Sequence, residues 1–373
     1  MDANGQAGTV PENVEAKIKE YVAACSTRDL AQLKQNQRII LKEERAANRW
    51  FVRVQNRIWR EPFRLLDLLI SYATSCGSAF SDGVFEYARG RNDSVFVALK
   101  YFHGRACQIS REISVLLKNG YGDGADARWR SLHEIYVFSL FIQKHGHESA
   151  TAYFDHLPIE EYNIQNEFVI HADQLYEKVD PAYFEILKNR RDELSATYGE
   201  VFCSDWGWAA RFLKTERPSY AKIERDVGMN HMKPYHKIAS NNIHANPGGT
   251  IRRLGSSTYA QNKLLLVGGS NWGMEGPGQK AALTLYQITD NFILHSPTSR
   301  EMLKLDIAFA LECKGMVNAL HSLMEETTHS FIDVAIAQDE RTRRAKEDGH
   351  SNIRYHHPSI KLELSKPNTV SHD

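Results

Sequence analysis

The sequence predicts an all-α protein, a multi-helix bundle with an antiparallel central helix pair. Apolar residues recur at helical spacing through most of the chain, whereas the alternating pattern of half-buried strands is scarce. No segment repeats with a period of about 20–50 residues, so a solenoid is not expected. The 373 residues are 25% charged and 42% hydrophobic, which is the composition of a globular protein with a sizeable core.

Residues 1–60 are predicted to form a charged helical N-terminal arm. After a small and polar start, the segments 13–24 and 29–60 are rich in charged, helix-favouring residues and poor in glycine. They describe one or two amphipathic helices with a wide polar face. We expect the arm to pack on the body or on a second copy of the chain, in a homo-oligomer. The apolar positions of the second segment are Leu33, Ile39, Ile40, Trp50, Phe51, Val54 and Ile58.

A helical bundle core domain is predicted over residues 61–338, followed by a polar and mobile tail over residues 339–373. Within the core, residues 77–93 and 246–249 are rich in Gly, Ser and Asn and are expected to be connections. The expected helices cover residues 63–76, 94–118, 125–144, 148–154, 160–179, 181–198, 206–214, 219–227, 256–267, 278–296 and 298–335.

The turn Asn119–Gly124 separates the two most regular helices, expected over residues 94–118 and 125–144. Three glycines and an aspartate in this turn suit the end of one helix and the cap of the next. So short a connection makes the two helices antiparallel neighbours. The second helix is apolar nearly all round from Ile135 to Ile142, which predicts a central position in the bundle.

The first half of the helix over residues 125–144 is the strongest candidate site. Charged and polar residues crowd into Arg128–Glu134, and Arg130 and Glu134 lie four residues apart on the face that continues into Phe138. Charges on a face that leads into a core are costly unless they are paired. The segment is either a structural Arg–Glu network that orients two helices, or a polar pocket for an anionic or carbonyl-bearing ligand.

A second candidate site lies between Met232 and Gly249. Tyr235, Ser240 and His244 are separated by five and four residues, so Ser240 and His244 share a face if both are on a helix. A Ser–His pair can activate a nucleophile, but the carboxylate that would orient the imidazole is not adjacent. Polar helix ends carry similar residues without being catalytic.

The strings Arg130-Ser-Leu-His-Glu134 and Tyr235-His-Lys-Ile-Ala-Ser240-Asn-Asn-Ile-His244 resemble a widespread bacterial family that is classified only as a domain of unknown function. Its members share an Arg-x-x-x-Glu on a central helix and a later Ser-x-x-x-His. The resemblance covers about residues 70–300. It implies an all-helical fold and singles out Arg130, Glu134, Ser240 and His244, but it implies no known activity.

At longer range, Arg128-Trp-Arg-Ser-Leu-His133 is similar to the Arg-x4–6-His motif of the HEPN superfamily, whose members include metal-independent RNases. This resemblance implies that Arg128 or Arg130 binds phosphate, and we expect Tyr235 of the second candidate site to lie beside the substrate. It also implies that His133 or His244 is the acid–base group. The partner would then be RNA or another phosphate-bearing ligand. The alternative is a non-catalytic binding or assembly module in which the Arg/Glu/His cluster is structural.

No metal or other cofactor is expected. A di-iron bundle needs two Glu-x-x-His motifs, and only Glu326–His329 fits. No cysteine pair has the C-x-x-C spacing of a zinc site. The run Gly273–Gly278 looks like the start of a phosphate loop, but Gln279 follows where the pattern requires lysine, and Pro277 removes a backbone donor.

Charge and targeting signals predict a cytoplasmic protein without a membrane partner. Lys plus Arg and Asp plus Glu both number 46, so the chain has no net field to attract nucleic acid or an anionic membrane. The five cysteines are scattered, as in free thiols of a reducing compartment. The N-terminus lacks a signal-peptide pattern, and the apolar run Ile135–Ile142 is too short to span a bilayer.

Overall fold

The computed structural model describes residues 12–175, 178–251 and 267–348, and these residues confirm the all-α prediction because they form helices and no strand. The chain divides into two units, one that includes residues 12–54 and one that begins at residue 55. No described helix is both long and apolar enough to cross a membrane. The α-helices are α1 Glu12–Ile58, α2 Arg60–Gly90, α3 Ser94–Lys118, α4 Gly122–His145, α5 His147–Asp155, α6 Leu157–Ile170, α7 Pro181–Tyr198, α8 Ala210–Leu213, α9 Tyr220–Asp226, α10 Lys233–Asn241, α11 Pro247–Ile251, α12 Glu275–Asp290, α13 Pro297–Leu305 and α14 Ile307–Glu347.

α1 is one continuous helix of 47 residues, so the segments 13–24 and 29–60 predicted for the arm join into a single element. Thr27, near the expected gap, turns its hydroxyl back onto the carbonyl of Ala23 (2.9 Å), which a helix interior tolerates. The helix is amphipathic and leaves much of its apolar surface in water. Its exposed large apolar residues are Val14, Ile18, Tyr21, Val22, Leu30, Leu33, Ile39, Leu41 and Trp50.

α2 continues through residues 77–90, where the sequence predicted a connection, and that prediction was wrong. Gly77 serves close packing rather than a turn, because a Cβ at this position would lie 2.1 Å from Cε1 of the His103 ring. Phe80 and Val84 continue the buried face of the helix beyond it. A helix can therefore pass through a Gly- and Ser-containing segment when its buried face is continuous.

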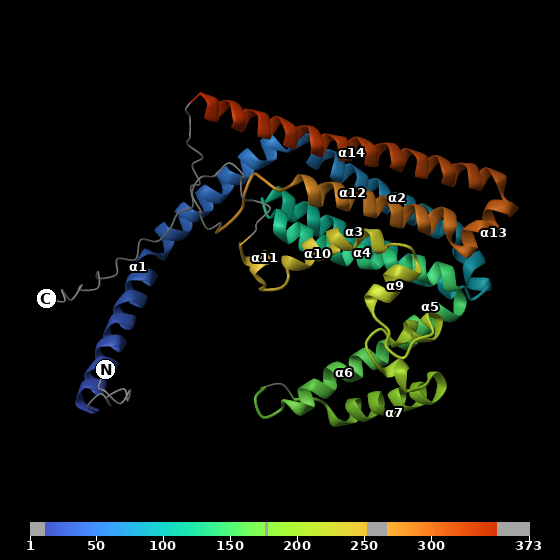
Figure 1. Ribbon diagram of the computed structural model, residues 1–373, viewed down its shortest axis with the longest axis horizontal. Coiled ribbons are helices and arrows are strands. Elements are labelled where there is room, and N and C mark those ends of the chain that lie inside the picture. Colours follow the sequence, from blue (N-terminus) through green and yellow to red (C-terminus); the bar gives the residue numbers. More distant parts are fainter. Residues whose placement is uncertain (1–11, 176–177, 252–266, 349–373) are drawn as a thin grey trace. The chain divides into compact units, whose positions relative to one another are not determined.

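α3 and α4 pack side by side in the body, joined by the three-residue turn Asn119–Tyr121 (Figure 1). Near the turn, Arg128 of α4 pairs with Glu112 of α3. At the other end, His147, just beyond α4, contacts the hydroxyl of Ser94 at the start of α3 (2.7 Å). The start of α4 thus lies beside the end of α3, and the end of α4 lies beside the start of α3, which is the arrangement of helices that run in opposite directions.

α12 packs against α2, α3, α4 and α14 and so completes the bundle (Figure 1). Its apolar side chains Leu285 and Ile288 are buried among these helices. Two hydrophobic clusters fill the space between these helices. One contains Phe80, Phe141 and Phe292, and the other contains Trp59, Trp129 and Phe331.

Four segments far apart in the sequence meet at one place, which we call the carbonyl junction. The Trp59 indole and the Gln338 amide both donate to the backbone carbonyl of Asn271, at 2.9 and 3.1 Å. The backbone amide of Ser270 donates to the carbonyl of Gly120 in the α3–α4 turn (2.9 Å). Gly120 has a φ of 79°, which glycine adopts without strain.

The C-terminal helices differ from the prediction at one internal point. The single helix expected over residues 298–335 is interrupted at Asp306, whose backbone is extended and whose carboxylate accepts a hydrogen bond from the Phe309 amide (3.0 Å). This cap starts α14. α14 continues to Glu347, past the predicted start of the tail at residue 339. The rest of that tail, residues 349–373, lies outside the described residues.

Several shorter predictions shift at their ends. α6 ends at Ile170 rather than at residue 179, and the helix expected over 278–296 begins at Glu275 and closes with a π-helical turn. Residues 246–249, predicted as a connection, include the start of α11. Nearly all of the helix predicted over residues 256–267 lies outside the described residues.

Candidate functional site

Arg130 and Glu134 pair on one face of α4, as their spacing predicts. Arg130 Nε lies 3.2 Å from Glu134 Oε1 and donates to Nε2 of His236 on α10 (3.1 Å). The His236 ring in turn stacks on Tyr220, with ring centroids 4.9 Å apart. The side chains of Arg130, Glu134 and His236 are only 28%, 25% and 15% exposed. The three groups therefore use one another as partners and join α4 to α10.

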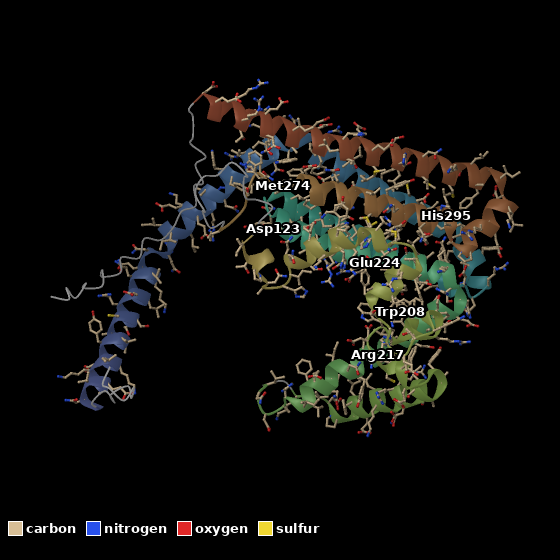
Figure 2. The ribbon with its side chains drawn as sticks, viewed as in Figure 1. Asp123, Trp208, Arg217, Glu224, Met274 and His295 are labelled. Carbon is tan, nitrogen blue, oxygen red and sulfur yellow. The ribbon has the colours of Figure 1, made fainter. Side chains whose placement is uncertain are left out.

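His133, on the neighbouring face of α4, is buried. Its side chain is 1% exposed, it stacks on Trp129, and its Nε2 lies 3.5 Å from Oε1 of Glu224 on α9 (Glu224 is labelled in Figure 2). Burial lowers the pKa of His133 to about 4, aided by the nearby His236, and burial raises the pKa of Glu224. His133 is therefore neutral at pH 7, and its contact with Glu224 is not an ion pair.

Asp126 extends this arrangement by one helical turn. Its carboxylate is fully buried and pairs with Lys280 of α12, whose ammonium also lies 4.4 Å from the centre of the Trp129 ring. Burial raises the pKa of Asp126, and the charge of Lys280 opposes that shift. The Trp129 indole donates to the Thr284 hydroxyl (3.0 Å). We call the whole set the polar seam: Asp126, Trp129, Arg130, His133, Glu134, Glu224, His236 and Lys280.

Arg128, the other predicted phosphate ligand, faces a different neighbour. Its guanidinium pairs with Glu112 of α3 and donates to the Ser131 hydroxyl (3.1 Å). Arg105 also approaches Glu112, at 3.6 Å. The structure thus brings Arg128 to the α3–α4 contact, where its partners Glu112 and Ser131 both lie outside the polar seam.

The predicted trio of Tyr235, Ser240 and His244 is not brought together by side-chain hydrogen bonds among the described residues. α10 ends at Asn241, so His244 lies beyond the helix and is exposed. The Ser240 hydroxyl donates to the backbone carbonyl of His236 in its own helix (2.7 Å), and Tyr235 is 51% exposed. The His244 amide still donates to the Ser240 carbonyl (3.2 Å), so one more helical turn joins the two residues, but the Ser240 hydroxyl is directed to His236 and not to the His244 ring.

Within the described parts of the chain, no group of three or more His, Cys, Asp or Glu side chains is arranged to hold a metal ion. The His133–Glu224 and His236–Glu134 contacts each bring only two such side chains together.

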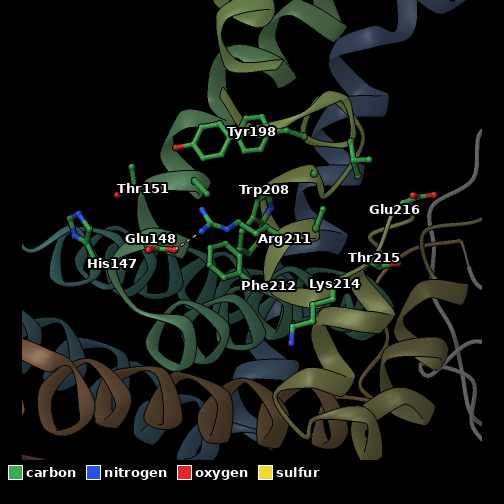
Figure 3. Close-up of a pocket in the computed structure, with 15 residues that line it drawn as sticks. His147, Glu148, Thr151, Tyr198, Trp208, Arg211, Phe212, Lys214, Thr215 and Glu216 are labelled. Carbon is green, nitrogen blue, oxygen red and sulfur yellow. Dashed lines mark ion pairs between the residues drawn. The ribbon is translucent and has the colours of Figure 1, made fainter. Parts of the chain in front are cut away.

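A pocket of about 560 Å³ lies elsewhere on the body, between α5, the end of α7 and the segment that follows α7 (Figure 3). We call it the aromatic pocket, because Tyr198, Phe202, Trp208 and Phe212 supply most of its apolar wall. At its rim Arg211 and Glu148 form an exposed ion pair at 3.5 Å (Figure 3). A volume of this size suits a small molecule.

Sequence reasoning missed this pocket because it predicted one helix over residues 206–214. The chain instead forms two short 3-10 helices, η1 Glu200–Cys203 and η2 Gly207–Ala209, before α8. Two left-handed residues flank η2 and α8: Trp206 with a φ of 62° and Lys214 with a φ of 49°. The available signal was a cluster of aromatic residues around two glycines, which is unlike an ordinary amphipathic helix.

Comparison with known proteins gives one partial family match and no activity. Neither a curated protein nor a solved structure matches the chain. One family model matches, over residues 96–261, a range that runs from α3 through the polar residues of α4 to α10 and beyond. The resemblance to a family of unknown function is thereby confirmed over a shorter range than about residues 70–300. Residues 96–261 match the family described as a family of unknown function, DUF5677.

Proposed function

We propose that the protein is a non-catalytic assembly module, in which α1 joins two copies of the chain and the polar seam is structural. The apolar surface of α1 carries this proposal, because many large apolar side chains along the helix are exposed and others are only half-buried. A helix in water gains little stability from its own hydrogen bonds and relies on packing of its apolar face. A helix of 47 residues with many exposed apolar side chains therefore favours a partner of the same length.

The spacing of the stripe favours a coiled coil between two copies. The positions 30, 33, 37, 40, 44, 47, 51 and 54 follow one another at intervals of three and four, the repeat that places one face of a helix against a partner, and six of the eight are apolar. Leu30 and Leu33 are exposed, and the following members are half-buried. Gln37 and Glu44 occupy the same series, and polar residues at such positions set register and partner number. The apolar members are Leu30, Leu33, Ile40, Ala47, Phe51 and Val54.

The polar seam supports the non-catalytic part of the proposal. An acid–base group must reach its substrate, and His133 is 1% exposed and stacked on Trp129. Arg130 is engaged by Glu134 and His236, which would have to be displaced before it could bind a phosphate. Groups that satisfy one another across two helices are suited to holding those helices together.

Sedimentation equilibrium of the full chain tests the assembly. The wild type is expected to dimerise at micromolar concentrations, and the double variant Leu33→Glu, Ile40→Glu should weaken the dimer at least about 100-fold, because it buries charge in place of apolar area. Ile39→Glu is the matched control, since Ile39 is 60% exposed but lies off the stripe. A monomeric wild type, or equal effects of the stripe and control variants, would overturn the proposal.

The competing proposal is metal-independent RNA cleavage by a HEPN-like effector, with Arg128 or Arg130 on the phosphate and His133 or His244 as the acid–base group. It is supported by the Arg-x4-His string on α4 and by the exposure of His244. RNA should be incubated without added metal with wild type, His133→Ala and His244→Ala. Cleavage that either variant abolishes while remaining folded would favour the nuclease, whereas intact RNA with all three proteins favours the assembly module.

A further inference from the structure

We infer that the aromatic pocket binds a small molecule with a flat apolar body and one anionic group, such as an aromatic carboxylate. The residues that line the pocket all lie between His147 and Glu216, and none belongs to α1 or to the polar seam. Its volume of about 560 Å³ falls within the range of small-molecule sites and is too small for a folded partner.

The wall of the pocket is held in place by tight backbone packing. A Cβ on Gly207 would lie 2.1 Å from the carbonyl oxygen of Phe202, so η1 and η2 approach as closely as they do only because residue 207 is glycine. Trp208 is thereby buried, edge-on to Tyr153 (5.1 Å between centroids) and to Phe141 (5.4 Å). The aromatic wall, which includes Trp208 (labelled in Figure 2), is therefore preformed, and this reduces the ordering cost of binding.

The segment that forms the wall is strained at both ends. Trp206 and Lys214 have φ values of 62° and 49°, in a region that bulky residues rarely adopt. Lys214 is the left-handed residue that ends α8, where its backbone amide donates to the Arg211 carbonyl (3.3 Å), and strained residues of this kind gather at binding sites. Lys214 lines the pocket rim, so one of the two strained residues carries a charged side chain next to the cavity.

Two ammonium groups near the rim lack a carboxylate partner among the described residues. Lys214 forms no ion pair with any of the described residues. The Lys222 ammonium donates to two neutral oxygens, the Thr215 hydroxyl and the Arg217 carbonyl, each at 2.7 Å. Thr215 lines the pocket, so the charge of Lys222 lies beside it.

The acidic side chains around the pocket do not balance these charges, since Asp155, which accepts the Tyr198 hydroxyl, already faces Arg190 at 3.9 Å. Of the two carboxylates that line the pocket, Glu148 is neutralised by Arg211 at 3.5 Å (Figure 3). Glu216 remains, against the two ammonium groups of Lys214 and Lys222. The excess of positive charge beside a flat aromatic wall assigns the ligand an anionic group rather than a cationic one.

Three probes of equal shape test this assignment on the full chain by calorimetric titration: 2-naphthalenesulfonate, 2-naphthalenemethanol and 2-naphthylmethylammonium. The sulfonate should bind at least about tenfold more tightly than the neutral probe, and the ammonium most weakly. Lys214→Gln should remove most of the advantage of the sulfonate and leave the neutral probe unchanged. Thr151→Phe, which places a ring in the cavity, should abolish binding of all three.

Lys188→Gln is the matched control, because Lys188 is an exposed lysine on α7 that does not line the pocket. It should leave all three affinities unchanged. Circular dichroism of Thr151→Phe distinguishes a filled pocket from a misfolded chain, and Lys214→Gln keeps the test informative if that chain misfolds. Absence of binding by all three probes overturns the site, and equal or tighter binding of the ammonium overturns the anionic assignment.

Discussion

The polar seam and the aromatic pocket occupy the same body and place polar and apolar groups in opposite ways. The seam buries charged groups and supplies each with a partner, as with Asp126 and Lys280. The pocket is lined by aromatic side chains and carries Lys214 unpaired among the described residues. Charge is thus satisfied where the chain closes on itself and left over where the surface is hollow. The difference separates a feature that holds the fold from one that is available to a ligand.

The largest test of this comparison is to remove the buried cation of the seam. Lys280→Met should lower the free energy of unfolding by about 3–5 kcal/mol at pH 8, because the carboxylate of Asp126 is fully buried and loses its partner. The loss should shrink at pH 5, since burial already raises the pKa of Asp126 and protonation removes the unpaired charge. Urea unfolding at the two pH values measures both effects.

Lys118→Met is the matched control for that substitution. Lys118 also pairs with an aspartate, but the side chain of Asp67 is 49% exposed. The control should therefore cost about 1 kcal/mol or less. Equal losses in the two variants would mean that the seam is no more dependent on its charges than the surface is.

The second test uses pH. His133 has a folded-state pKa of about 4 against an ordinary 6.5, so the unfolded chain takes up a proton first as the pH falls. In Glu224→Gln, stability should therefore fall by up to about 3 kcal/mol between pH 6.5 and pH 4. Denaturant unfolding at a series of pH values, with the double variant His133→Gln, Glu224→Gln as the reference, isolates this contribution.

Glu224 should make the free energy of unfolding depend on pH in the opposite direction. Burial raises its pKa, so the folded chain takes up the proton first, and in His133→Gln stability should rise as the pH falls toward the ordinary carboxyl range. The same reference variant applies. Slopes of the same sign in the two single variants would show that the pair is hydrated rather than buried.

The smallest test concerns the pocket. Lys214→Gly should raise the free energy of unfolding by about 0.5 kcal/mol, because glycine adopts the left-handed φ of 49° without strain, although it also loosens the unfolded chain. Gly199→Ala is the converse control, since residue 199 has a φ of 89° and alanine there should cost about 1 kcal/mol. Thermal unfolding measures the stability of both variants. A loss of stability in Lys214→Gly would mean that the backbone of residue 214 is not strained.

Much of the fold could be predicted because helical periodicity is a local property. The expected helices over residues 94–118 and 181–198 match α3 and α7 at both ends. Residues 77–90 were misjudged because a glycine such as Gly77 usually indicates a turn. Here glycine is required because the His103 ring of another helix leaves no space for a side chain. The break at Asp306 is likewise a single cap inside an unbroken apolar pattern.

The candidate site was less predictable, because it depends on residues that meet only in three dimensions. The spacing of Arg130 and Glu134 indicated a pair on one face, and they do pair. Nothing in the local sequence indicated that His236 would complete that pair. Lys280, assigned by sequence to a failed phosphate-loop pattern, lies instead against Asp126, 154 residues away. The pocket depends on two strained residues that no periodicity indicates.

The carbonyl junction bears on the order in which the chain folds. It joins Trp59 to Asn271 across 212 residues and Gln338 to the same carbonyl across 67. The contact between Arg128 and Glu112 in the central hairpin spans only 16. Loop-closure entropy grows with the length of the loop, and contacts between distant residues slow folding. We therefore expect the α3–α4 hairpin to form early, as the nucleus on which α12 and α14 condense. The junction then closes last and makes the four segments unfold as one cooperative unit.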